Sequence, residues 1–200
     1  MDFLDPQNLI HAAGLIGVMA VIFAESGLFF GFFLPGDSLL FTAGLLASQG
    51  YLNIIFLVLG CIVAAIAGDS VGYAFGRKVG PKLFTREDSL LFKKKHVARA
   101  EAFYKRYGAK TIFLARFVPV VRTFAPIIAG IGSMPYRTFA RWNVLGGLAW
   151  AALVPLSGYF LGAAFPKISE YLDIVIIGII LLSFVPIVIE WAKERKRPVV

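Results

Sequence analysis

Long apolar stretches restrict this chain more than any other feature. They cover about residues 9–48, 51–76, 111–133, 139–165 and 171–191. A membrane-spanning helix needs roughly 20 consecutive apolar residues, and 51–76, 139–165 and 171–191 meet that requirement directly. Hydrophobic residues make up 58% of the 200 residues and charged residues only 16%, whereas soluble domains have about 25% charged residues. The sequence therefore predicts an all-α polytopic membrane protein.

Basic residues are concentrated in two polar segments. Eleven of the 20 Lys and Arg residues lie within 77–110, and four more lie in the tail, 193–200. An excess of Lys and Arg marks cytoplasmic loops, so both segments, and with them the C-terminus, are predicted to be cytoplasmic. The net charge of +8 then reflects topology, and we expect no nucleic-acid binding. Acidic residues at the start of the chain, Asp2 and Asp5, predict that no signal peptide is cleaved.

One apolar stretch is a poor candidate for a lipid-facing helix. Residues 111–133 contain two arginines and two prolines: Arg116, Pro119, Arg122 and Pro126. A charged side chain at the bilayer centre costs roughly 2.5–3.5 kcal/mol. If both basic segments are cytoplasmic, the chain must cross the membrane an even number of times between them. The spans 139–165 and 171–191 already supply two crossings. Residues 111–133 are therefore predicted to form a re-entrant hairpin with breaks at the prolines and arms of about 11 residues each.

The first apolar stretch has the same combination of charge and break signals. These are Glu25, Pro35, Gly36 and Asp37. We expect a second hairpin over about 23–48, broken at Pro35 and Gly36. Residues 9–22 leave two interpretations open, because they are short for a span but continue without interruption into the apolar residues that follow.

An internal repeat relates the two halves of the chain. Residues 43–76 align without gaps on 129–162, and the identities include the two glycines and the tyrosine of a shared G-Y-x-x-G pattern. The first span would run from outside to inside and the second from inside to outside, so the repeat is predicted to be inverted. Inverted repeats with discontinuous helices are typical of transporters.

The predicted organisation is a single membrane domain over 1–200. Its parts are repeat 1 at about 21–76, a cytoplasmic linker at 77–110, repeat 2 at about 111–165, a C-terminal transmembrane helix at 171–191 and a basic tail at 193–200. Within the linker, residues 85–108 begin with a capping-box-like Thr85-x-x-Asp88 and end at Gly108. Their aromatic and basic residues predict an interfacial amphipathic helix.

Several motifs follow one another between about residues 20 and 165. They are F-A-E-S at 23–26, F-L-P-G-D at 33–37, G-D-S-V-G-Y-A-F-G-R at 68–77, Y-G-A-K-T-I-F-L-A-R-F-V-P-V-V-R-T-F-A-P at 107–126, A-G-I-G-S-M at 129–134, and the asparagine, glycine and tryptophan of 143–150. Together they resemble the DedA family, also called the VTT or SNARE-associated domain family. The resemblance implies lipid transport through two opposed re-entrant hairpins, linked to the proton motive force. Bacterial members are associated with undecaprenyl phosphate or phosphatidylethanolamine, and eukaryotic relatives with phospholipid scrambling.

The resemblance also implies that an acidic pair and an arginine pair are needed for function. By motif these pairs are Glu25 with Asp37, and Arg116 with Arg122. A break near Pro119 would let both arginines point at one spot, where guanidinium groups can bind the phosphate of a lipid in a bidentate manner. The alternative is that the arginines only neutralise the two carboxylates.

The carboxylates have two interpretations as well. Asp37 either caps free N–H groups at the start of a helix or takes up and releases a proton. Glu25 has no local capping role and is the better candidate for a proton carrier. Asp69 lies near the cytoplasmic end of a span, where we expect it to pair with Arg77 or Lys78 in a structural role.

The sequence thus predicts a flippase-like or scramblase-like transporter of a phospholipid or polyprenyl phosphate in the bacterial cytoplasmic membrane. The expected partners are membrane lipids and protons, and a homo-oligomer is left open. The alternatives are a scaffold for membrane homeostasis and an exchanger of small ions or protons. His11 and His96 have no partner at metal-ligand spacing, and the motifs of common catalytic sites do not occur. We therefore expect no metal, no cofactor and no enzymatic activity.

Overall fold

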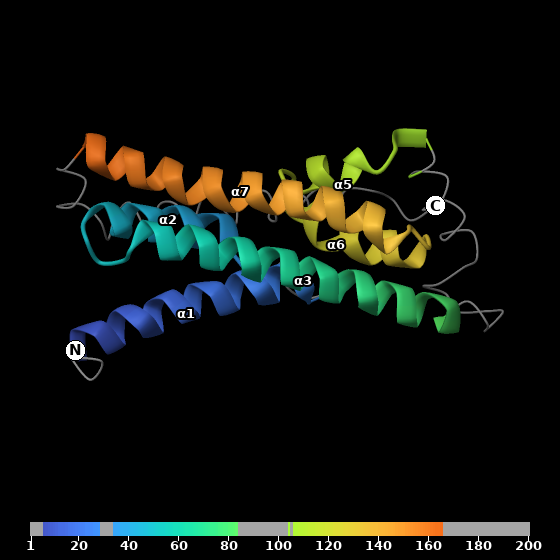
Figure 1. The fold of residues 1–200 in the computed structure, drawn as a ribbon, viewed down its shortest axis with the longest axis horizontal. Coiled ribbons are helices and arrows are strands. Elements are labelled where there is room, and N and C mark those ends of the chain that lie inside the picture. Colours follow the sequence, from blue (N-terminus) through green and yellow to red (C-terminus); the bar gives the residue numbers. More distant parts are fainter. Residues whose placement is uncertain (1–5, 29–33, 84–103, 105, 166–200) are drawn as a thin grey trace, which may run out of the picture.

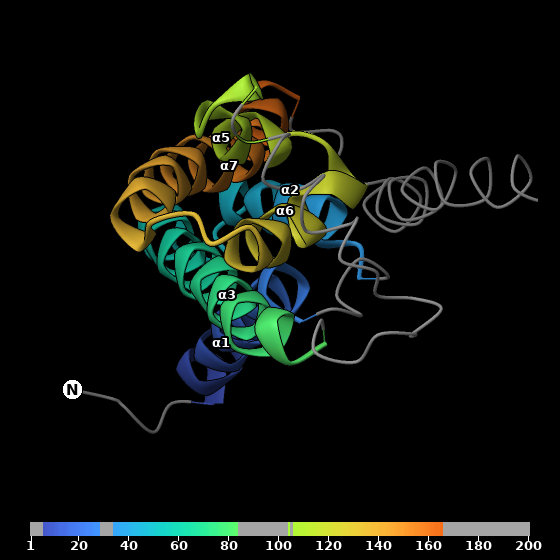
Figure 2. The same ribbon diagram turned by 90° about the vertical axis from the view of Figure 1, so that its right-hand side faces the viewer.

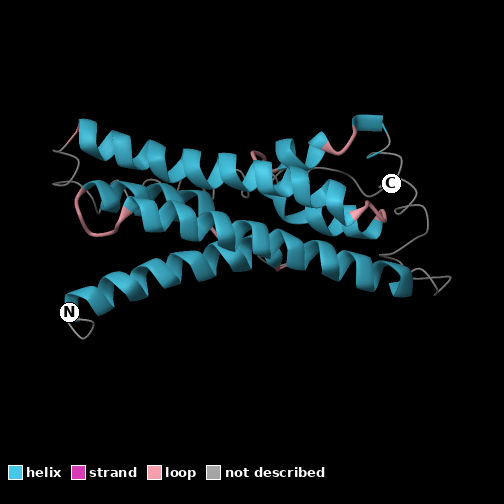
Figure 3. Ribbon diagram, in the orientation of Figure 1, coloured by secondary structure: helices cyan, strands magenta, loops and turns pink. Residues whose placement is uncertain are grey.

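The computed structural model describes residues 6–28, 34–83, 104 and 106–165, and this part of the chain contains helices and no strand. The helices are α1 (Pro6–Gly27), α2 (Gly36–Ser48), α3 (Ile54–Leu83), α5 (Lys110–Ala115), α6 (Pro119–Ile131) and α7 (Tyr136–Ala164) (Figure 1). Short loops join them where the neighbouring helices are described (Figure 3). The predicted C-terminal helix at 171–191 and most of the predicted amphipathic helix at 85–108 lie outside the described residues.

Two long helices, α3 and α7, form the frame of the molecule. The segments Ile54–Val79 and Tyr136–Ala164 are long and apolar enough to cross a membrane. Large apolar side chains are exposed along both helices, among them Phe56 and Val63 on α3 and Phe160 on α7. Because so much exposed apolar surface is unfavourable in water, these faces suit a lipid environment. The two predicted spans are confirmed as helices, but α3 continues beyond Gly76 to Leu83, into the predicted linker.

The start of α3 follows from a turn and a cap in the sequence. Gly50 has a positive φ of 85°, a conformation that glycine adopts without steric cost. The side-chain Oδ1 of Asn53 then accepts hydrogen bonds from the backbone N–H groups of Ile55 (3.0 Å) and Phe56 (3.2 Å). Asn53 therefore satisfies two of the donors that a helix leaves free at its N-terminal end.

Two half-length helices, α2 and α6, lie between the long ones. Each has 13 residues, or about 20 Å at 1.5 Å per residue, which is short of a hydrocarbon core of about 30 Å. In Figure 1 they occupy opposite halves of the molecule with their N-terminal ends toward the centre, and in Figure 2 they lie one behind the other. α2 packs mainly on α7, and α6 mainly on α3.

The structure places chain breaks at two of the predicted positions. Pro35 precedes α2, which begins at Gly36, and Pro119 begins α6 after the extended residue Val118 (φ −115°, ψ 108°). Pro126, in contrast, lies inside α6 and does not break the helix. It is fully buried, and packing between helices can hold a proline within a membrane helix without a break. Residues 29–33 of the first predicted hairpin lie outside the described residues.

The helices at the positions of the predicted hairpin arms differ in length from the prediction. α1 is continuous from Pro6 to Gly27, so residues 9–22 belong to one longer helix that carries Glu25 near its end. On the other side, α5 has 6 residues instead of about 11. Gly108, with a φ of 76°, ends the preceding turn in a left-handed conformation, and α5 starts only at Lys110.

Glycines bring the half-helices into backbone contact with the long helices. A Cβ atom at Gly44 would lie 2.0 Å from the Pro155 carbonyl oxygen, and one at Gly158 would lie 2.1 Å from that of Phe41. On the other pair, a Cβ at Gly76 would lie 2.1 Å from the Ile127 carbonyl oxygen. Since real Cβ atoms do not approach oxygen so closely, only glycine permits these interfaces.

Replacing one of these glycines tests the close contact. Gly44→Ala should lower the free energy of unfolding by about 1–3 kcal/mol, because the methyl group must push α2 away from α7. The control is Gly17→Ala on the exposed surface of α1, where a Cβ meets nothing within 4 Å and helix propensity should improve. Thermal unfolding of the detergent-solubilised chain measures both, and equal melting temperatures for the two variants would contradict the packing.

Candidate functional site

A buried arginine on α6 joins three segments of the chain. The Arg122 guanidinium pairs with the Glu25 carboxylate of α1 and, through Nη1, with Asp37 Oδ1 of α2 at 2.7 Å. Only 8% of the Arg122 side chain and 3% of that of Glu25 are exposed, whereas 40% of the Asp37 side chain is exposed. The first ion-pair centre is therefore closed on the Glu25 side and open at Asp37.

Trp150 of α7 completes this first centre. Its ring lies 4.7 Å from the Arg122 guanidinium carbon, within cation–π distance. Its Nε1 donates a hydrogen bond to Asp37 Oδ1 at 2.9 Å. Trp150 thus orients both members of one ion pair. Sequence reasoning assigned it no role, although a buried tryptophan among the small residues of an apolar helix was an available signal.

The second arginine forms a separate centre. Arg116 lies at the break between α5 and α6, and its Nη2 pairs with Asp69 of α3. The same nitrogen donates to Asn143 Oδ1 of α7 at 2.7 Å, and all three side chains are buried. Asn143 was quoted only as part of a motif, yet its amide lies between α3 and the break.

The prediction that Asp69 pairs with Arg77 or Lys78 was wrong. Arg77 instead donates a hydrogen bond to the Tyr73 hydroxyl at 3.0 Å. Side chains three or four residues apart are neighbours on a helix surface, and Asp69 is eight residues before Arg77, or about 12 Å along α3. The side chain of Asp69 instead faces Arg116 across the helix interface.

The two arginines do not meet at one spot as predicted. Arg122 faces Glu25 and Asp37, and Arg116 faces Asp69. The two arginines are nevertheless only six residues apart, one on each side of the start of α6. We call these five residues the charge cluster. It lies where the N-terminal ends of α2 and α6 approach each other, and these ends carry the positive poles of the helix dipoles.

Two buried oxygen atoms near these residues have no hydrogen-bond partner among the described residues. They are Glu25 Oε2 and Thr123 Oγ1. A Cβ atom at Gly36 would lie 1.5 Å from Glu25 Oε2, so the glycine of the chain break makes room for this carboxylate. Buried polar atoms without partners are rare in proteins and need an explanation such as a functional role. Sequence reasoning missed Thr123, although it directly follows Arg122.

The start of α2 bears on the two interpretations of Asp37. α2 has no side-chain hydrogen bond from its N-cap residue, Pro35, and Asp37 lies in its first turn. Oδ1 of Asp37 accepts from both Arg122 and Trp150. In this structure the carboxylate therefore serves the ion-pair centre, while its position in the first turn also suits the helix dipole.

Comparison with known proteins assigns the class of membrane protein. The VTT domain matches residues 34–160. Protein DedA of Escherichia coli K12 is 47% identical over 178 residues, covering 88% of this chain and 81% of DedA. Uncharacterized membrane proteins of Mycobacterium leprae and Mycobacterium tuberculosis H37Rv are each 42% identical, covering 98% and 96% of this chain and 88% and 87% of those proteins. No solved structure gives a significant match. The chain belongs to the DedA family of VTT-domain membrane proteins.

The partner of Asp69 can be tested by stability. Asp69→Asn should cost about 3–5 kcal/mol, because it leaves the Arg116 guanidinium buried without a counter-charge. Adding Arg116→Gln should recover part of that loss, since the unpaired charge is then gone. Arg77→Gln is the matched control and should change stability by less than about 1 kcal/mol. Chemical denaturation in detergent measures all three, and a larger loss for Arg77→Gln than for Asp69→Asn would contradict the assignment.

Proposed function

We propose that this protein transports a phosphate-containing lipid across the bacterial cytoplasmic membrane and that this transport is linked to the proton motive force. Undecaprenyl phosphate and glycerophospholipids such as phosphatidylethanolamine are the lipid classes concerned. The observation that carries the proposal is the ion-pair centre in which buried Arg122 lies between Glu25 and the partly exposed Asp37. A purely structural ion pair gains little from being exposed on one side only, whereas a binding site needs an opening.

The positive side of the site suits a phosphate group. A guanidinium stays charged when it is buried and presents parallel N–H donors to phosphate oxygens. The N-terminal ends of α2 and α6 add positive potential at the same place. A lipid phosphate that entered at Asp37 could replace the Glu25 carboxylate as a partner of Arg122 when Glu25 is protonated, because the displaced carboxyl group is then neutral.

The charge balance supports a link to protons. Two guanidinium groups, of Arg116 and Arg122, face three carboxylates, of Glu25, Asp37 and Asp69. The charge cluster therefore has one negative charge in excess when all three carboxylates are ionised, and one bound proton makes it neutral. Glu25 is the best carrier, because it is the more buried carboxylate of the first centre and its Oε2 has no hydrogen-bond partner among the described residues. Protonation of Glu25 would weaken its hold on Arg122 and free that arginine for a phosphate.

The arrangement of the helices supports an alternating transporter. The half-helices α2 and α6 approach each other end to end, and each packs on the long helix of the other half of the chain. This is the arrangement expected of two opposed re-entrant hairpins in an inverted repeat. The exposed apolar surfaces of α3 and α7 would leave the lipid tails in the bilayer while the headgroup crosses.

Reconstitution into liposomes tests the proposal. Vesicles containing the purified chain, labelled phosphatidylethanolamine or labelled undecaprenyl phosphate, and a pH gradient should move lipid between leaflets faster than protein-free vesicles. Arg122→Lys should slow transport about tenfold or more, because it keeps the charge but loses the bidentate geometry. Arg137→Gln, which removes an exposed charge, is the control and should transport at the unchanged rate.

The proton link has its own test in the same vesicles. Glu25→Gln should abolish the dependence of transport on the pH gradient, because glutamine cannot carry the proton. Transport by Glu25→Gln that keeps its full pH dependence would contradict the proton role. No lipid movement above protein-free vesicles would contradict the transport proposal, and proton flux without lipid movement would instead favour an ion exchanger.

A further inference from the structure

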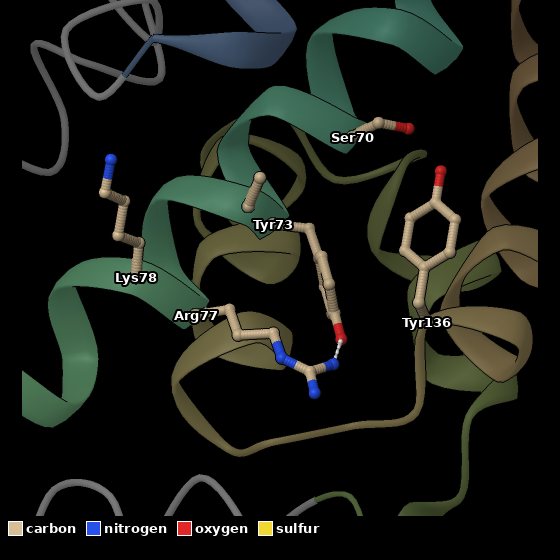
Figure 4. Close-up of a pocket in the computed structure, with 6 residues that line it drawn as sticks. Ser70, Tyr73, Arg77, Lys78 and Tyr136 are labelled. Carbon is tan, nitrogen blue, oxygen red and sulfur yellow. Dashed lines mark hydrogen bonds between the residues drawn. The ribbon is translucent and has the colours of Figure 1, made fainter.

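A cleft near the C-terminal end of α3 is not used by the site described above. It has a volume of about 530 Å³ and is lined by Ser70, Tyr73, Ala74, Arg77, Lys78 and Tyr136 (Figure 4). This volume falls within the range of small-molecule sites, about 300–1,000 Å³. Two cationic and three hydroxyl-bearing side chains in one cleft favour an anionic, hydrogen-bonding ligand.

The guanidinium of Arg77 is held in place by a hydrogen bond and has no ion pair with another described residue. It donates to the Tyr73 hydroxyl at 3.0 Å, and that hydroxyl donates to the Met134 carbonyl oxygen. Among the described residues, the ion pairs all involve Arg116 or Arg122. In Figure 4 the Arg77 guanidinium lies at the hydroxyl end of Tyr73, the hydroxyl groups of Tyr136 and Ser70 lie at the other end of the cleft, and the Lys78 amine points away from Tyr136. Arg77 is thus a positioned cation, and its hydrogen bond to Tyr73 uses only one of the five N–H donors of a guanidinium group.

One wall of the cleft leads to the charge cluster through hydrogen bonds. Ser70, which lines the cleft, accepts a hydrogen bond from Asn143 Nδ2 at 3.5 Å. Asn143 Oδ1 in turn accepts from Arg116 at 2.7 Å. Hydrogen bonds therefore join the Ser70 wall of the cleft to Arg116 in the interior, and Arg77 lies seven residues from Ser70, or about 10 Å along α3.

The position of the cleft suits the level of lipid headgroups. Arg77 and Lys78 are the last charged residues within the apolar segment Ile54–Val79, where basic side chains reach the membrane interface. Tyrosine is also enriched at this level. A lipid phosphate would meet Arg77 there, with its acyl chains still in the bilayer.

We propose that this cleft binds the phosphate group of an anionic lipid and is the station from which the headgroup passes to Arg116. Binding at the cleft stands on its own geometry, and the passage to Arg116 rests on the proposed transport function. Arg77 supplies the charge that holds the phosphate, and the hydroxyl groups of Tyr136 and Ser70, which lie at the other end of the cleft (Figure 4), line the way toward Arg116. Free inorganic phosphate has the same chemistry and is separated from the lipid by the experiment.

The lone cysteine makes a direct binding measurement practical. Cys61 is fully buried, and in a Cys61→Ala background a single reporter, Ala74→Cys, lies in the cleft wall. The rate at which a charged maleimide labels this reporter is measured on the full chain in detergent. The probes are dihexanoyl phosphatidic acid, inorganic phosphate and dihexanoylglycerol, which has no phosphate. The control reporter is Lys110→Cys, an exposed position outside the cleft.

Dihexanoyl phosphatidic acid should slow the labelling of Ala74→Cys and leave that of Lys110→Cys unchanged, and dihexanoylglycerol should protect neither. Arg77→Gln should raise the concentration needed for protection about tenfold, as expected for a lost charge-assisted bond. Arg77→Lys should give an intermediate value, and Arg137→Gln, which removes a charge near Tyr136 but outside the cleft lining, should have no effect.

The outcomes separate this proposal from the transport function. Protection that is absent, or that survives Arg77→Gln in a folded variant, would overturn the cleft as a phosphate site. Protection by inorganic phosphate but not by phosphatidic acid would overturn the link to lipid. If protection requires Arg77 but liposomes show no lipid movement, the cleft stands and the transport proposal fails.

Discussion

The ion pairs of Arg122 are the interaction on which the rest of the structure depends. α2 and α6 are too short to cross a bilayer, so neither can be held by hydrophobic length alone. Arg122 connects the start of α6 to the start of α2 and to the end of α1. Removing one partner of such a buried pair leaves a charge in a low-dielectric interior, at a cost of several kcal/mol. The three helices are therefore joined at one place, where α1 ends and where α2 and α6 begin.

The centre around Arg116 differs from the centre around Arg122 in its bonding and exposure. Arg116 and Asp69 are both buried and bonded to Asn143, so this centre ties the break between α5 and α6 to both long helices. The first centre contains the open Asp37 and the unpartnered oxygen of Glu25. Among the described residues, the buried oxygen atoms without partners thus lie at or next to the Arg122 centre. Under the proposed function, this difference favours Arg122 as the group that holds the phosphate within the charge cluster.

Much of the fold could be predicted because apolar length and chain breaks are local properties. The existence and the central parts of α3 and α7 followed from runs of apolar residues, although α3 extends seven residues past the predicted end, and Pro35, Gly36 and Pro119 fall where half-helices begin. Pro126 could not be judged in the same way, since its tolerance depends on burial against another helix. The partner of Asp69 could not be predicted either. α3 itself offers two cations close in sequence, whereas the actual partner, Arg116, lies 47 residues further along the chain. Local spacing cannot show which face of α3 meets the break.

The glycines of α3 have a consequence for how this helix is shared between its neighbours. Gly68, Gly72 and Gly76 recur every four residues and therefore follow one face of α3. A Cβ atom at Gly68 would meet the Phe23 carbonyl oxygen of α1, whereas one at Gly76 would meet the Ile127 carbonyl oxygen of α6. One stripe of small residues thus lets two different helices approach α3 at backbone distance, and a side chain added at either end of the stripe would displace a different partner.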